Sequence, residues 1–197
     1  MKTNVIIISG IAGSGKSTLA ESISKELGWK CVHASDILRQ LKHKKMEEID
    51  PYKTKQGKGY WESEEAMQYC RDRLQNLDWD KLVNERLYKL VEEGNVVFDS
   101  WTLPWLTKKG VKIWLKVSSE ERIKRLADRD TLSIEKAQKR VLEKEEKTIA
   151  IFEKAFGFRF GADLSPFHLI LDTNSLNAKE VFKIVSCFSK VWLEKKQ

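Results

Sequence analysis

A glycine-rich segment near the N-terminus carries the residues best suited to chemistry. The string GIAGSGKST, residues 10–18, matches the pattern G-x-x-x-x-G-K-[ST]. A polyphosphate needs several donors that converge on one anion, and glycines let backbone N–H groups come close while the chain turns through positive φ. The segment therefore predicts a phosphate loop that binds a nucleoside triphosphate.

Each type of residue in this loop has an expected part in the chemistry. Lys16 would bridge the β and γ phosphates, the Ser17 hydroxyl would ligate Mg²⁺, and Thr18 would assist at the α-phosphate. The helix that follows presents its unpaired amides and the positive end of its dipole. The alternative is a glycine-rich turn without a ligand. The residues expected to contact ATP are Gly10, Ala12, Gly13, Ser14, Gly15, Lys16, Ser17 and Thr18.

Further chemical groups stand at a strand end and on a helix. Asp99 follows a buried apolar run, and a carboxylate there can hold Mg²⁺ or orient an acceptor hydroxyl. Arg122, Arg125 and Arg129 are spaced to share one helical face, so they could converge on a moving phosphoryl group. We expect Lys16, Asp99, Arg125 and Arg129 to be catalytic, with Ser17 and Asp99 at the metal. The competing interpretations are a plain strand-end aspartate and a solvated, salt-bridged helix.

The elements that would position these groups alternate between strands and helices. Five short β-branched or apolar runs are expected as strands, at residues 5–8, 31–34, 96–99, 111–117 and 169–171. Helical spacing is expected at residues 16–27, from near 36, at 62–93 in two helices divided at 76–80, at 118–129 after a capping box, at 133–156 as a projecting arm, and from 177. The polar sequence of residues 42–60 predicts a flexible connection. This alternation predicts an α/β fold with a five-stranded parallel sheet.

Composition limits the functional class. The 197 residues, 41% of them apolar, fit one domain, and 36 basic against 29 acidic side chains give +7, which favours anionic partners. Three separated cysteines argue against a disulfide scaffold or zinc module. No apolar run approaches the roughly 18 to 20 residues that cross a bilayer. We therefore expect a cytoplasmic monomer without a membrane partner.

Taken in order, the motifs resemble those of the nucleoside monophosphate kinases, most closely the short archaeal type of cytidylate kinase. The likeness spans nearly the whole chain. Its segments are ISGIAGSGKST, ASDILR at Ala34–Arg39, LVEEGNVVFD, KIWLKVSSEERIKRLADRD, SIEKA and LILDTNSL.

The resemblance implies a three-layer α/β/α P-loop kinase core with two helical insertions. Residues 36–93 would form the acceptor-binding lobe, and residues 122–156 the lid. ATP would be the donor, with Mg²⁺, and a pyrimidine nucleoside monophosphate the acceptor. The residues implied for the acceptor are Asp36, Arg39, Arg86, where the local match is loose, and Trp101.

The sequence departs from the family where an acceptor phosphate is gripped. The family has an arginine after its third strand, whereas this chain continues Asp99, Ser100, Trp101. Arginines of the family's long lid helix correspond here to Lys144, Lys147, Ile149 and Ile151. A lysine binds an anion as a point charge, without the two-point geometry of arginine, and an isoleucine has no group that binds an anion. These departures suggest an acceptor other than CMP, such as one without a phosphate, with Trp101 and Trp105 as a flat wall.

Other features receive structural interpretations. His33, His43 and His168 lack partners at metal-ligand spacing and are expected to be structural. RNA-recognition signatures are absent, so nucleic acid is not an expected partner. Two alternatives to the nucleotide kinase stay open: a kinase of a non-nucleotide or unphosphorylated acceptor, and a nucleotide-binding regulatory protein without acceptor activity.

Overall fold

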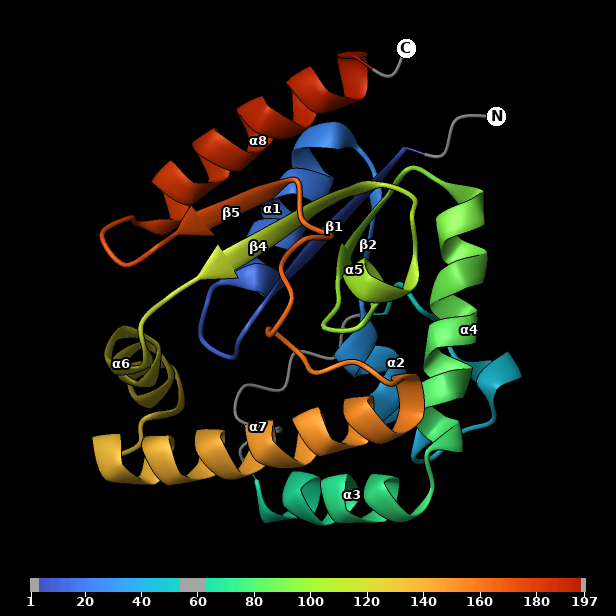
Figure 1. Ribbon diagram of the computed structural model, residues 1–197, viewed down its shortest axis with the longest axis vertical. Coiled ribbons are helices and arrows are strands. Elements are labelled where there is room, and N and C mark those ends of the chain that lie inside the picture. Colours follow the sequence, from blue (N-terminus) through green and yellow to red (C-terminus); the bar gives the residue numbers. More distant parts are fainter. Residues whose placement is uncertain (1–3, 54–62, 196–197) are drawn as a thin grey trace.

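The computed structural model describes residues 4–53 and 63–195 and shows a twisted, all-parallel sheet with helices on both faces (Figure 1). The strand order is β2-β3-β1-β4-β5, so the first strand is central. Its residues are all buried, as the uninterrupted apolar run predicts. The strands are β1 (Val5–Gly10), β2 (Lys30–His33), β3 (Val96–Asp99), β4 (Val111–Lys116) and β5 (Leu169–Asp172).

Two apolar cores separate the layers. Because side chains alternate along a strand, Ile6 and Ile8 pack with α1 and α8 on one face, while Val5 and Ile7 pack with α2 and α4 on the other. This arrangement confirms the three-layer α/β/α fold. The helices are α1 (Lys16–Leu27), α2 (Ala34–Leu41), α3 (Glu64–Gln75), α4 (Asp78–Glu93), α5 (Leu103–Leu106), α6 (Ser119–Asp130), α7 (Ile134–Phe156) and α8 (Ala178–Lys195), with a 3₁₀ turn at Met46–Glu48.

Hydroxyl caps fix the starts of the helices that border the site. The Ser118 side chain accepts a hydrogen bond from the Glu121 N–H at 3.2 Å, which confirms the predicted cap of α6. Ser133 caps α7 in the same way. Among the described helices, none combines the length and apolar character needed to span a bilayer.

The predicted flexible connection at residues 42–60 is wrong for its first part. Ile49 is buried in the core beneath α2 and α4, and Tyr52 packs against the same core. The side-chain amide of Gln40 donates to the Asp50 carbonyl at 3.2 Å, which ties the segment to α2. Two apolar anchors in a polar stretch are enough to order it. Residues 54–60 of this expectation lie outside the described part of the chain.

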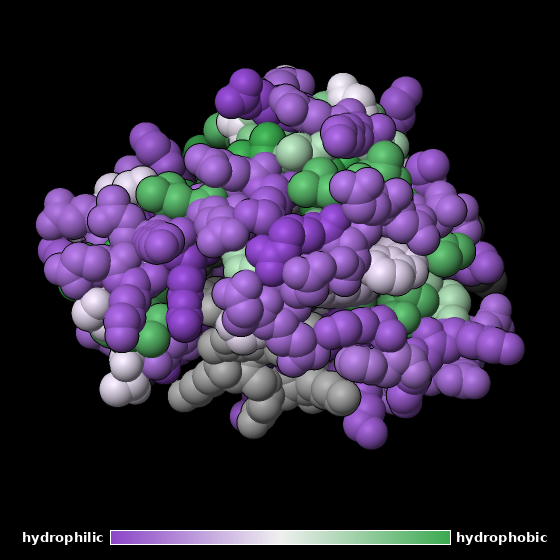
Figure 2. Space-filling view, turned by 90° about the horizontal axis from the view of Figure 1, so that it is seen from below, coloured by the Kyte–Doolittle hydropathy of each residue, from purple (hydrophilic) through white to green (hydrophobic). Residues whose placement is uncertain are grey.

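Helix α7 is not the projecting arm that its charged sequence suggested. It lies across the carboxyl end of the sheet, alongside α3 and α6 (Figure 1). The face of the molecule seen from below in Figure 2 is mostly hydrophilic. Near the C-terminus of α7, however, Ile151 and Phe152 are buried in an aromatic cluster with Trp114 and Phe160. This apolar end holds the helix to the core.

Candidate active site

The phosphate loop runs from the end of β1 to the first turn of α1. Gly10, Gly13 and Gly15 all have positive φ, at 146°, 80° and 90°. A Cβ on Gly13 would lie 2.8 Å from the Arg122 carbonyl oxygen, so α6 is pressed directly against the loop. Glycine is required here by both conformation and contact.

Lys16 is buried at the centre of the site. Its ammonium donates to the Ile11 carbonyl at 2.9 Å and lies 5.5 Å from the ring centroid of Trp101. Burial lowers the pKa of Lys16 to about 8, aided by the charges of Lys144 and Arg129 and opposed by Asp99 and Glu145. The negative charge of a bound polyphosphate would oppose this effect and favour the charged form of Lys16.

Asp99, at the end of β3, contacts residues of two neighbouring elements, α1 and β2. Its Oδ2 accepts a 2.6 Å hydrogen bond from the Ser17 hydroxyl and lies 3.2 Å from His33 Nδ1. Burial alone would raise the pKa of Asp99, but the hydrogen bond from His33 and the charge of Lys16 hold it below its usual range. Likewise, burial opposes protonation of His33, yet the hydrogen bonds with Asp99 and Cys31 raise its pKa to about 11. Both pKa shifts favour the charged forms, a carboxylate beside an imidazolium.

A cavity of about 480 Å³ opens between the phosphate loop, the α2–α4 region, α6 and α7. Its walls carry an excess of positive charge over two carboxylates, which suits a polyanionic occupant. The cations are Lys16, Arg73, Arg125, Arg129 and Lys144, and the carboxylates are Asp80 and Asp99.

A second hollow of about 350 Å³ adjoins this cavity beside α1 and the loop after β5. Its apolar floor includes Leu19, Leu176 and Val181. Arg125 stands between the two spaces, donating to Glu121 and, at 2.8 Å, to the Thr173 carbonyl. Both spaces are lined by Gly15, Thr18 and Arg125, so they meet at the phosphate loop.

Helices α6 and α7 contribute cationic side chains to the cavity wall. Lys144 of α7 lies 5.8 Å from the Trp101 ring centroid, on the ring that Lys16 also approaches. Arg129 lines the cavity and donates two hydrogen bonds to Asp130. Lys147 instead bonds Glu143 at 2.7 Å, and Ile151 lies in the aromatic cluster. Of the four α7 positions noted in the sequence, Lys144 is the one that lines the cavity.

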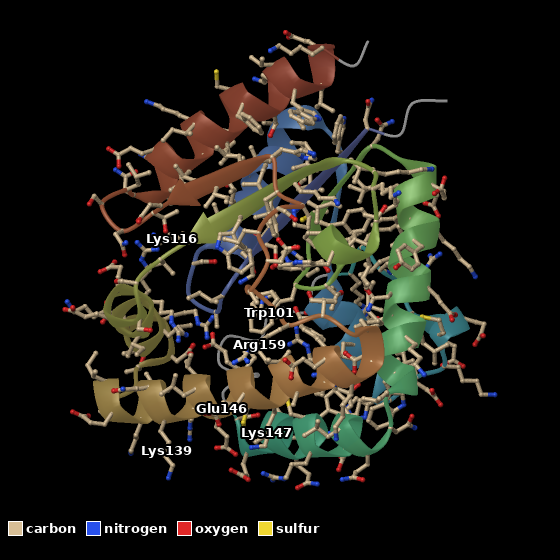
Figure 3. All side chains as sticks on the ribbon, in the orientation of Figure 1. Trp101, Lys116, Lys139, Glu146, Lys147 and Arg159 are labelled. Atoms are coloured by element: carbon tan, nitrogen blue, oxygen red, sulfur yellow. The ribbon has the colours of Figure 1, made fainter. Side chains whose placement is uncertain are left out.

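The acceptor residues implied by resemblance are not brought together. Trp101 lines the cavity, between the sheet and α7 in Figure 3, with its ring stacked 4.5 Å from Phe160. Asp36 and Arg39 form a buried ion pair beside the cavity, without lining it, and burial raises the pKa of Asp36.

Arg86 needs a correction. It is absent from the cavity wall and lies close enough to Lys30 for their charges to repel. Lys30 begins β2, at the end of the sheet opposite the site. Arg86 lies away from the cavity because α4 contributes Asp80 and Asn84 to the cavity wall and then runs away from it.

Several site residues were missed. His33 was read as structural, although the register of the parallel strands sets it directly beside Asp99. The cavity wall itself includes four residues that the sequence did not single out, Arg73, Asp80, Asn84 and Thr102. The Arg73 guanidinium and Asp80 carboxylate form a buried, two-point ion pair at 3.0 and 2.6 Å. The sequence shows that His33 ends a predicted strand, but not that this strand lies beside β3. The Arg73–Asp80 pair joins two helices and has no signal in the sequence.

The donor set suits a magnesium ion that is shared with phosphate. Ser17 and Asp99 offer a hydroxyl and a carboxylate, both hard oxygen donors. Among the described residues, no group of three or more His, Cys, Asp or Glu side chains could hold a metal unaided. Mg²⁺ usually keeps waters and phosphate oxygens as ligands, so two protein oxygens fit it.

Comparison with known proteins decides the family. Residues 5–175 match the model of the cytidylate kinase-like family. The chain belongs to that family. This cytidylate kinase-like protein is 29% identical over 194 residues to the cytidylate kinase of Sulfurisphaera tokodaii, covering 97% of this chain and 98% of the relative. It is 31% identical over 182 residues to that of Pyrococcus horikoshii, covering 92% and 85%.

Solved structures agree on the fold of this cytidylate kinase-like protein. Shikimate kinase from Bacteroides thetaiotaomicron superposes with a TM-score of 0.57 at 14% identity, covering 98% of this chain and 99% of that one. A gluconokinase from Sinorhizobium meliloti gives 0.56 at 14% identity, covering 99% and 97%. The chain has the fold of the P-loop kinases, and its family makes it an ATP-dependent phosphotransferase.

Proposed function

We propose that this protein transfers the γ-phosphoryl group of ATP to a pyrimidine nucleoside monophosphate. The supporting observation is the meeting of two spaces at the phosphate loop, through Gly15, Thr18 and Arg125. A donor nucleoside in the apolar-floored hollow would direct its phosphates past α1 toward the cationic cavity, where an acceptor waits. The cytidylate kinases among its relatives support the choice of pyrimidine.

The residues of the chain would act mainly by charge and position. Lys16 is expected to hold the β and γ phosphates, while Arg125, Arg129 and Lys144 approach from α6 and α7 to offset charge on the transferred group. Phe152 of α7 adds an apolar side chain to the cavity wall, which would help to exclude water. Ser17 and Asp99 would hold Mg²⁺, which would supply neutralisation of phosphate charge.

The acceptor would occupy the half of the cavity built by α2, α3 and α4. Asn84 and Thr102 offer polar groups there, and Trp101 offers a flat apolar face. We propose residues 36–93 as the acceptor-binding lobe and residues 122–156 as the lid. Asp36 and Arg39 border the acceptor half, so a role for them requires a small shift on binding.

A second candidate is an acceptor without a phosphate. In the part of the cavity wall built by α2, α3 and α4, the cationic residue is Arg73, and Asp80 neutralises it in a two-point pair. Trp101 stands directly after Asp99, where the family carries an arginine. A hydroxyl acceptor would then face the Asp99 carboxylate.

An ADP-release assay separates the candidates. The panel is CMP, UMP, dCMP, AMP, the matching nucleosides and small polyols, with Lys16→Ala as the inactive control. Turnover highest with CMP or UMP supports the first proposal. Turnover confined to nucleosides or polyols supports the second. Binding of ATP without ADP release from any acceptor contradicts both.

A further inference from the structure

His33 is tied to the catalytic end of the sheet by strand register. In the parallel pairing of β2 with β3, His33 lies opposite Asp99, and both are the last residues of their strands. The imidazole is 5% exposed, and its Nδ1 is 3.2 Å from Asp99 Oδ2. The pairing of the two strands therefore holds the ring against the carboxylate.

The direction of the hydrogen bonds follows from chemistry. An ionised carboxylate only accepts, so both the Ser17 hydroxyl and His33 Nδ1 must donate to the same oxygen, Oδ2. Because the Ser17 hydroxyl donates its hydrogen bond to Asp99, the lone pairs of its oxygen remain available to bind a cation. The far side of the imidazole, Nε2, lies 3.6 Å from Cys31 Sγ and 3.5 Å from Glu21. The register of β2 with β3, rather than these longer contacts, sets the position of the ring beside Asp99.

We infer that His33 is a positioning residue for the magnesium-assisted step: it holds Asp99 so that Ser17 presents its oxygen lone pairs to the metal of the bound nucleotide. The chain of contacts runs from His33 to Asp99 to Ser17. Partners that orient metal ligands typically contribute about 10-fold to 100-fold to metal affinity or activity. The inference rests on the proposed function insofar as it assumes Mg²⁺ and ATP, and it is independent of the acceptor.

Two near-isosteric substitutions give the test. His33→Asn keeps a donor nitrogen as many bonds from Cα as Nδ1, whereas His33→Leu keeps the shape and removes the donor. Calorimetry would measure ATP affinity with magnesium and with EDTA, and ADP release would give kcat and the magnesium concentration at half-maximal rate. Glu21→Gln, on the outer side of the ring, is the matched control, since Glu21 lies outside both cavity walls.

For His33→Leu we expect the half-saturating magnesium concentration to rise about 10-fold or more, with ATP affinity in EDTA within about 2-fold of wild type. His33→Asn should recover most of the loss, and Glu21→Gln should behave as wild type. A structural role alone would lower the melting temperature without moving the magnesium dependence.

The inference is overturned if His33→Leu keeps the wild-type magnesium dependence, or if His33→Asn is as impaired as His33→Leu. If His33→Leu does not fold, His33→Gln replaces it, because its amide nitrogen is displaced by one bond and should not restore the contact. A wild-type protein that releases no ADP with any acceptor would contradict the proposed function instead, and magnesium-dependent ATP binding would still test His33.

Discussion

The Glu145 carboxylate of α7 accepts a hydrogen bond from the backbone N–H of Ala12 in the phosphate loop, at 3.4 Å. The same oxygen accepts from Arg122 Nη1 at 2.8 Å. Because the backbone of Arg122 is also packed against Gly13, this ion pair joins α6, α7 and the phosphate loop at one point. Its removal should disturb all three.

We expect Glu145→Ala to lower the free energy of unfolding by about 3 kcal/mol, because it leaves the buried Arg122 guanidinium without its carboxylate. Replacing both residues with methionine should restore most of the loss, since an apolar pair carries no uncompensated charge. Urea unfolding followed by circular dichroism checks both. Equal destabilisation in the single and double variants would contradict this account.

Gly13→Ala and Gly28→Ala form a matched pair of substitutions at positive φ. At Gly13 the new Cβ meets the backbone of Arg122, whereas at Gly28, which ends α1, it meets open space. Gly28→Ala should cost about 1 kcal/mol of stability and leave ATP affinity unchanged. Gly13→Ala should weaken ATP binding at least about 10-fold, because α6 and the loop must separate. Calorimetric titration with ATP measures the difference.

Lys16→Met should reduce kcat by about 100-fold or more, the scale found when one preorganised charge-stabilising donor is removed. The folded protein should be no less stable, since burial disfavours the charged ammonium. Lys25→Met, on an exposed position of the same helix, is the control. A clear loss of melting temperature in Lys16→Met alone would show that the lysine serves the fold.

Thr102→Val probes the acceptor half of the cavity. The Thr102 hydroxyl donates to Asn84 Oδ1 at 2.7 Å, and both residues are buried at the cavity wall. Loss of this bond, worth about 1 kcal/mol, should raise the acceptor KM about 5-fold and leave the KM for ATP unchanged. Thr107→Val, whose hydroxyl accepts from the Lys109 N–H outside the cavity, should change neither constant.

The sheet and most helices could be predicted because their signals are local. Residues 5–8 are apolar at each position, and the glycine ending α1 follows a clear amphipathic stripe. The projecting-arm interpretation of α7 failed because charge density describes the solvent side of a helix and says little about a few buried residues such as Phe152. Its burial depends on Phe160 and Trp114, which are distant in sequence or on another element.

The phosphate loop could be found because its ligand-binding groups are neighbours in the chain. Asp99 was predicted from its place at a strand end. His33 was missed because its significance depends on which strand lies beside β3, which single-sequence periodicity does not give. Arg86 was placed by resemblance at a loosely matching position; it follows Asn84 by two residues, about 200° around α4, so it lies on a different side of the helix from the cavity residues.

The aromatic ring of Trp101 belongs to two structures at once. It faces the cavity, and it also packs on Phe160 and meets Phe152 of α7 edge-on at 6.3 Å. A substitution of Trp101 would thus alter both the fit of the acceptor and the packing of α7 against the core. A change of acceptor specificity through Trp101 would therefore require compensating substitutions at its ring partners, Phe152 and Phe160.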